Sequence, residues 1–195
     1  MMYCQKYTAL FICFSLLSFN VSSQVLTDSE ASSYQLGVAY GNTYVSQNVG
    51  PLQYSEASLQ RPMATNLEWL PSFIVPKLEL NLGELSTGGS RGYLLGAGPK
   101  LDLHLSNNVT LGGAFRFVYL DKFKLRSADS RRMRNYGGHR QFQYYWELMY
   151  RSSDTVAMGY RWLHMSNGMQ VLPKNLKYEH NPVIETHNLV LTFSF

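Results

Sequence analysis

The feature that most restricts the fold of this chain is a two-residue alternation between apolar side chains and small or polar ones. The alternation recurs in segments of roughly ten residues along the sequence. In residues 74–82, for example, every second position from 78 onward is leucine, and charged or amide side chains stand between the leucines. Successive side chains of a strand point to opposite faces, so each segment is expected to form a strand with one apolar face. No run of eighteen apolar residues occurs after residue 23, which excludes a helical membrane protein.

Eight such segments are expected, seven of them clear and one weak. The clear segments are residues 34–40, 74–82, 93–104, 109–119, 141–150, 156–166 and 188–195, and the weak one runs from Leu52 to Arg61. Eight strands of this length, apolar outside and polar inside, predict an all-β fold: an eight-stranded antiparallel transmembrane β-barrel with up-and-down meander order. The interior of so small a barrel is filled by side chains and forms no wide pore.

The charged side chains support the barrel, because the alternation turns them inward. They are Lys77, Lys100, Arg116 and Arg161, which are expected to pair with Glu79, Asp102 and Glu147 in a closed network. Buried charges are tolerated when they are paired and hydrogen-bonded. In a soluble β-sandwich, the alternative, the same charged face would meet water. The strand lengths, the aromatic content of 14% and the terminal Phe195 favour the membrane.

The first residues are typical of a secretory signal peptide. Lys6 supplies the positive region, residues 9–19 the apolar core, and residues 21–23 a small-residue cleavage site. Both cysteines of the sequence lie inside this segment, so the mature chain should contain no disulfide. Its removal takes one lysine and no acid, which lowers the formal net charge from +4 to +3. The expected organisation is therefore a signal peptide at 1–23 and one barrel domain at 24–195.

The connections between the strands predict the orientation of the barrel. Residues 106–108 and 152–154 are short turns, whereas 121–138 and 167–184 are long connections. Outer-membrane barrels keep short turns on the periplasmic side and long loops outside. The end of the seventh expected strand and the start of the eighth should therefore lie at the outer leaflet.

A candidate catalytic group lies at that end. His164 and Ser166 are two residues apart in one strand and share a face with the apolar side chains that should meet lipid. A base beside a hydroxyl is the arrangement that activates a serine nucleophile, and a carboxylate would orient the imidazole. Glu185, at the start of the next strand, is the first candidate for the carboxylate, and Glu179 in the loop stays open as the second. Donors to a developing oxyanion would be Asn167 and the backbone around Gly168.

These residues resemble those of a known family. Residues 164–167 (His-Met-Ser-Asn), followed by 181–185 (Asn-Pro-Val-Ile-Glu) and a last strand, are similar to the outer-membrane lipid A 3-O-deacylase family, known as PagL. The specific match covers residues 156–195. The resemblance implies an eight-stranded barrel that hydrolyses the ester-linked hydroxyacyl chain at position 3 of lipid A, with His164, Ser166 and Glu185 as the triad. The chain departs from the family in a longer loop before Glu185 and in Val183, where the family pattern has glycine.

The long connection after the fifth expected strand is strongly basic. Residues 121–140 carry Lys122, Lys124, Arg126, Arg131, Arg132, Arg134 and Arg140 against Asp121 and Asp129. On the outside of a Gram-negative cell such cations would meet lipopolysaccharide phosphates, for which the arginine fork is suited. Arg131, Arg132 and Arg134 are the candidates for substrate phosphates. A solvated loop without a substrate role is the alternative.

The sequence thus predicts a serine esterase of the Gram-negative outer membrane that acts on lipid A, with its active site at the outer leaflet. It needs no cofactor and no metal, and no nucleic-acid partner is expected; a homodimer is left open. Two other readings remain. One is a non-enzymatic structural or adhesive barrel that binds lipopolysaccharide through the basic loop. The other is a different outer-membrane acyl hydrolase or acyltransferase, such as a phospholipase or palmitoyltransferase.

Overall fold

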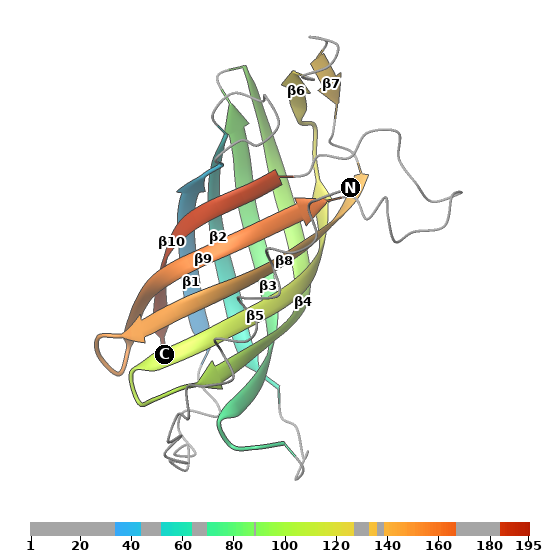
Figure 1. Ribbon diagram of the computed structural model, residues 1–195. Coiled ribbons are helices and arrows are strands. Elements are labelled where there is room, and N and C mark those ends of the chain that lie inside the picture. Colours follow the sequence, from blue (N-terminus) through green and yellow to red (C-terminus); the bar gives the residue numbers. More distant parts are fainter. Residues whose placement is uncertain are drawn as a thin grey trace, which may run out of the picture.

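The computed structural model describes residues 34–43, 52–63, 70–87, 89–126, 133–135, 139–166 and 184–195. They form a closed β-barrel, and a short two-stranded sheet stands beside one end of it (Figure 1). The barrel strands are β1 (Gln35–Asn42), β2 (Gln53–Pro62), β3 (Ile74–Thr87), β4 (Ser90–His104), β5 (Val109–Leu120), β8 (His139–Arg151), β9 (Val156–Ser166) and β10 (Ile184–Ser194). The small sheet pairs β6 (Lys124–Arg126) with β7 (Met133–Asn135).

Each barrel strand pairs antiparallel with the barrel strands that precede and follow it in the chain, and β1 closes the ring by pairing with β10. The β6–β7 sheet lies in the connection between the paired strands β5 and β8. The predicted fold class, an eight-stranded antiparallel meander, is therefore confirmed. The weak segment from Leu52 to Arg61 is the strand β2, paired with β1 and β3. The β6–β7 pair was not predicted and lies within the basic connection. The expected signal peptide at 1–23 lies outside the described residues.

The outer wall of the barrel is apolar and rich in aromatic rings, as the alternation predicts. Its large exposed side chains include Leu36, Val38, Tyr40, Leu59, Leu78, Leu80, Leu82, Tyr93, Leu95, Leu101, Phe115, Phe117, Tyr119, Tyr144, Trp146, Leu148, Tyr150, Met158, Leu189 and Phe193. In water such a surface would drive aggregation. In a bilayer it is the surface that hydrocarbon chains solvate.

The two ends of the barrel differ. The connections 121–138 and 167–183 leave from one end, called here the outer end, together with the tight β3–β4 hairpin, in which Thr87 pairs with Ser90. The turns after β4 and β8 lie at the opposite end. There Tyr34 and Phe195 exchange two backbone hydrogen bonds of 3.0 Å. In the described part of the chain, no helix has the length and apolar character needed to cross a membrane.

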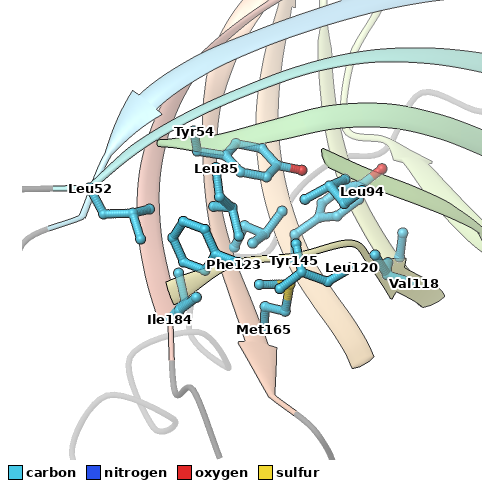
Figure 2. Packing of buried hydrophobic residues seen from close by; sticks show 12 residues of the cluster. Leu52, Tyr54, Leu85, Leu94, Val118, Leu120, Phe123, Tyr145, Met165 and Ile184 are labelled. Atoms are coloured by element: carbon cyan, nitrogen blue, oxygen red, sulfur yellow. The ribbon is translucent and has the colours of Figure 1, made fainter. Parts of the chain in front are cut away.

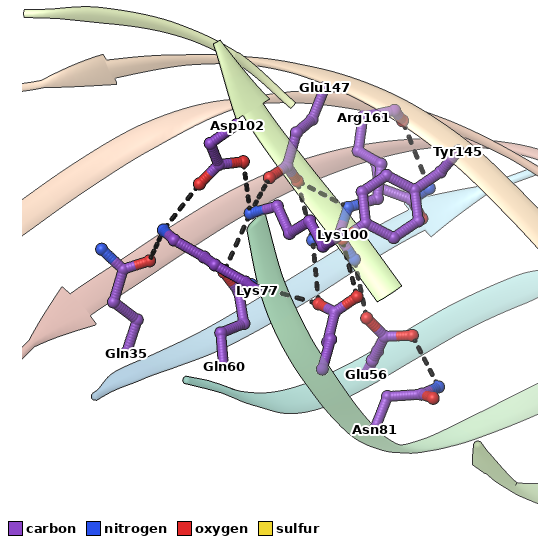
Figure 3. Close-up of polar contacts among 12 residues, drawn as sticks. Gln35, Glu56, Gln60, Lys77, Asn81, Lys100, Asp102, Tyr145, Glu147 and Arg161 are labelled. Atoms are coloured by element: carbon purple, nitrogen blue, oxygen red, sulfur yellow. Dashed lines mark hydrogen bonds and ion pairs between the residues drawn. The ribbon is translucent and has the colours of Figure 1, made fainter. Parts of the chain in front are cut away.

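The interior is layered along the barrel axis. An apolar cluster that includes Leu94, Leu120, Leu163 and Met165 fills the outer end, and Phe123 from the connection after β5 packs into it (Figure 2). Charged side chains fill the middle (Figure 3). A small polar pocket opens among the described residues at the end of the short turns. The barrel is thus packed with side chains, as its size requires.

The charged layer is balanced, with four basic and four acidic side chains. Its ion pairs are Lys77–Asp102 (2.6 Å), Lys100–Asp102 (3.2 Å), Lys100–Glu147 (2.6 Å), Arg116–Glu56 (2.9 Å), Arg116–Glu79 (3.5 Å), Arg161–Glu56 (2.6 Å), Arg161–Glu79 (4.0 Å) and Arg161–Glu147 (2.8 Å). Tyr145 donates a hydrogen bond of 2.7 Å to Glu79, and its ring lies under the guanidinium of Arg161 at 4.0 Å. The predicted network is confirmed, and Glu56 on β2 is the additional acid that neutralises it.

Candidate active site on the outer wall

The candidate catalytic residues lie on the outside of β9 and β10. Leu163 and Met165 on β9 are completely buried in the apolar cluster of the interior. Successive side chains of a strand point to opposite faces. His164, between these two residues, and Ser166, directly after Met165, therefore point outward. The packing of the interior thereby holds His164 and Ser166 on the face of β9 that meets lipid.

His164 and Glu185 are directly paired across the β9–β10 ladder. His164 Nδ1 and Glu185 Oε1 are 3.3 Å apart, and the exposed fractions of the two side chains are 15% and 43%. A carboxylate can only accept a hydrogen bond, so Nδ1 carries the proton in this contact. The other ring nitrogen, Nε2, is then left as the acceptor in the neutral imidazole, as a general base requires.

On its opposite side His164 is covered by Tyr144, its partner in the β8–β9 ladder. The two rings stack with centroids 4.6 Å apart and an interplanar angle of 26°. Trp162 also approaches the imidazole, at 6.1 Å between centroids. The histidine is therefore held between a carboxylate from β10 and an aromatic ring from β8. Tyr144 was not predicted as a site residue.

Ser166 follows His164 on the same face and ends β9, where it pairs with Phe142. Two residues along a strand span about 7 Å between Cα atoms. Within the described residues no hydrogen bond joins Ser166 to His164. Such contacts are commonly long in enzymes without substrate and close as the substrate binds. The structure thus brings His164 and Glu185 into contact, with Ser166 beside them at the outer edge of the wall.

A second polar pair lies beside the first, toward the middle of the wall. His187 on β10 faces Trp162 on β9, and the hydroxyl of Tyr160 is hydrogen-bonded to Nδ1 of His187. Polar groups therefore follow the outer face of the β9–β10 seam. Among the described residues no group of three or more histidine, cysteine, aspartate or glutamate side chains is arranged to hold a metal ion.

Several predicted site residues lie outside the described part of the chain. They are Asn167, Gly168, Glu179, Arg131 and Arg132. For Arg134 the structure describes the backbone, which belongs to β7. Of the basic residues in 121–140, Lys122, Lys124 and Arg140 have described side chains, and all three are exposed.

Comparison with solved structures finds the same fold. The chain is similar to the N-terminal β-barrel domain of Pseudomonas aeruginosa OprF, with a TM-score of 0.56, 10% sequence identity and coverage of 84% of this chain and 98% of that one. It is also similar to Ail, the attachment invasion locus protein of Yersinia pestis, with a TM-score of 0.52, 9% identity and coverage of 84% and 99%. No family model and no curated protein matches the sequence.

The fold, the apolar wall and these likenesses together define the class. The chain is an eight-stranded β-barrel of the Gram-negative outer membrane. At 9–10% identity the likeness concerns the fold alone.

Proposed function

We propose that this barrel is a serine esterase that removes the ester-linked hydroxyacyl chain at position 3 of lipid A. The observation that carries the proposal is the His164–Glu185 contact on the lipid-facing wall, with Ser166 on the same face. The resemblance of residues 156–195 to the lipid A 3-O-deacylases supports the same activity and names the substrate.

The position of the pair argues for a function rather than for a role in folding. The charged network of the interior is complete without it. Most of the remaining outer wall is aliphatic or aromatic. An ionisable pair that faces lipid weakens a barrel or at best leaves its stability unchanged near the interface. Ionisable groups in such places commonly serve chemistry or transport.

The chemistry follows from the roles of the three side chains. His164 Nε2 takes the proton of Ser166 while Oγ attacks the ester carbonyl, and Glu185 stabilises the imidazolium through Nδ1–H. The tetrahedral intermediate then expels the 3-oxygen of the sugar, which receives the proton from His164. Water, activated by the same base, hydrolyses the acyl-serine and frees the fatty acid. Asn167 and the backbone at Gly168 are the expected oxyanion donors.

The outward site also fits the way in which a lipid would arrive. A lipid A molecule diffusing in the outer leaflet meets the wall of β9 and β10 sideways and enters no pore. Its phosphates would lie at the level of the outer connections. Lys122 and Lys124 are exposed there, and Arg131, Arg132 and Arg134 belong to the same connection.

The test is hydrolysis of purified lipopolysaccharide by the detergent-solubilised protein. The proposal expects release of free 3-hydroxy fatty acid and a lipid A product that lacks one acyl chain. A folded protein that leaves lipid A intact would favour the structural or adhesive barrel. Release of a phospholipid fatty acid, or transfer of a palmitoyl chain, would favour the other enzyme classes.

The identity of the third triad member gives a ranked prediction. Glu185→Ala should lower the rate of deacylation by about a hundredfold or more, because the imidazolium loses its partner. Glu179→Ala should have a much smaller effect. The rates of hydroxy fatty acid release by the two variants show which glutamate is the third triad member. The reverse ranking would assign that role to Glu179 in the loop.

Tyr144 is expected to act as a positioning residue for His164. Tyr144→Ala should lower kcat by about three- to tenfold, the usual value of a stacked aromatic pair. Tyr144→Phe keeps the ring and should restore the rate to near that of the intact protein. Equal losses in both variants would mean that the hydroxyl, rather than stacking, is what matters.

A further inference from the structure

A glycine on the outer wall has no steric reason to be there. The other glycines of the described strands point into the filled interior, where an added Cβ would meet a neighbouring atom at 2.0 to 2.9 Å. At Gly113 on β5 the nearest atom would be the carbonyl oxygen of Tyr145, at an ordinary 3.7 Å. Gly113 directly follows Gly112. Glycine weakens a strand, and within one it marks a bulge, a bend or a site where a ligand or another backbone approaches closely.

Large side chains surround this position on all four sides. Gly113 is paired with Leu101 on β4 and with Trp146 on β8, and Leu111 and Phe115 are its neighbours on the same face of β5. Leu101, Trp146 and Phe115 are all exposed on the wall. The missing side chain therefore leaves a notch among these apolar side chains.

The notch has a defined position relative to Ser166. The ladder rows across β9, β8 and β5 are Ser166–Phe142–Phe117, His164–Tyr144–Phe115 and Trp162–Trp146–Gly113. Gly113 is thus two strands away from Ser166 and four residues toward the periplasmic end. With the usual strand rise and spacing, the two Cα atoms are about 17 Å apart along the wall.

The tilt of the strands turns this diagonal into a vertical line. In Figure 1, β9 rises from lower left to upper right, with β8 and then β5 below it on the right. Starting from the outer end of β9, four residues back along the strand lead down and to the left in this view. Crossing from β9 over β8 to β5 leads down and to the right. For strands tilted by about 35–45°, the sideways shifts nearly cancel. At that general tilt, the ladder rows place Gly113 almost directly beneath Ser166 along the barrel axis, with Tyr144 about halfway between them.

We propose that the notch at Gly113 receives the end of the acyl chain whose ester lies at Ser166, and that it thereby sets the preferred acyl length. The depth of one leaflet's hydrocarbon, about 15 Å, is close to the separation of the two residues. A chain that descends from Ser166 would cross the ring of Tyr144 and end between Phe115 and Trp146. This inference rests on the proposed esterase function.

The test compares acyl-length preference between variants that differ only in the outer wall. The substrates are glucosamine esters that differ in the 3-O-acyl chain, from butanoyl to tetradecanoyl, presented in detergent micelles. Gly113→Phe fills the notch, and Gly113→Ala adds only the Cβ for which there is room. Ala97→Phe is the control, because Ala97 on β4 pairs with Phe117 and lies well to the side of the line. Heat-dependent gel mobility verifies that each variant is folded.

Gly113→Phe should lower kcat/KM for the tetradecanoyl ester about tenfold, since it displaces roughly two methylenes from the wall. The butanoyl ester is too short to reach the notch, so Gly113→Phe and the intact protein should cleave it at similar rates. Ala97→Phe should keep the length profile of the intact protein. An unchanged profile in Gly113→Phe would overturn the inference and leave the esterase intact. Failure of the intact protein to cleave any of these esters or lipid A would overturn both.

Discussion

Replacing Ser166 with alanine is expected to lower the rate of lipid A deacylation by about a thousandfold or more. Without Oγ no acyl-enzyme forms, and removal of a catalytic serine typically leaves only the rate that binding and oxyanion donors provide. The side chain stands at the end of β9 and faces outward, so the alanine variant should fold like the intact protein. The measurement is the initial rate of hydroxy fatty acid release by purified protein in detergent micelles.

The matched control is a serine elsewhere on the outer wall. Ser55 lies between the buried Tyr54 and Glu56 on β2 and therefore also points outward. Ser55→Ala should retain the full rate. If Ser166→Ala kept more than about a tenth of the activity, the residue would not be the nucleophile.

Replacing Glu56 with alanine is expected to give the largest loss of stability. Glu56 Oε1 binds Arg161 at 2.6 Å and Arg116 at 2.9 Å, and Asn81 donates a hydrogen bond of 3.0 Å to Oε2. Its removal leaves an unbalanced positive charge among buried side chains. Breaking a buried ion pair in this way costs about 3–5 kcal/mol of unfolding free energy. Equilibrium unfolding in urea, with the barrel in detergent micelles, measures the loss.

Arg91→Ala provides the comparison for this prediction. Arg91 also forms an ion pair, with Glu84 at 2.9 Å, but its side chain is 64% exposed. Exposed pairs contribute little to stability, so the urea midpoint should hardly move. Similar losses in both variants would contradict a special role for the interior network.

Most of the barrel could be predicted from the sequence because lipid and a filled interior demand opposite polarity on alternate residues. The weak prediction was β2, whose outward residues include Ser55 and Ala57 and whose alternation is therefore faint. The inward charges could have supported this strand, because the four predicted basic side chains faced only three predicted acids. The structure supplies Glu56 from β2 as the fourth acid.

The candidate site was accessible to sequence reasoning only in part. The period of the strand predicts that His164 and Ser166 share a face. The register that sets Glu185 opposite His164 follows a long connection, whose length fixes no pairing. Tyr144 could have been found, because the short turn after Arg151 pairs that residue with Ala157 and so determines the whole β8–β9 register. The proposed role of Gly113 could not have been found from the sequence, because it depends on the tilt of three strands.

The most direct test of the esterase proposal is mass spectrometry of lipid A from Gram-negative cells that express the intact protein or its Ser166→Ala variant. The account predicts a lipid A species lighter by one hydroxyacyl chain with the intact protein and unmodified lipid A with the variant. Unmodified lipid A with both, from cells whose folded protein also fails to deacylate lipid A in detergent, would contradict it.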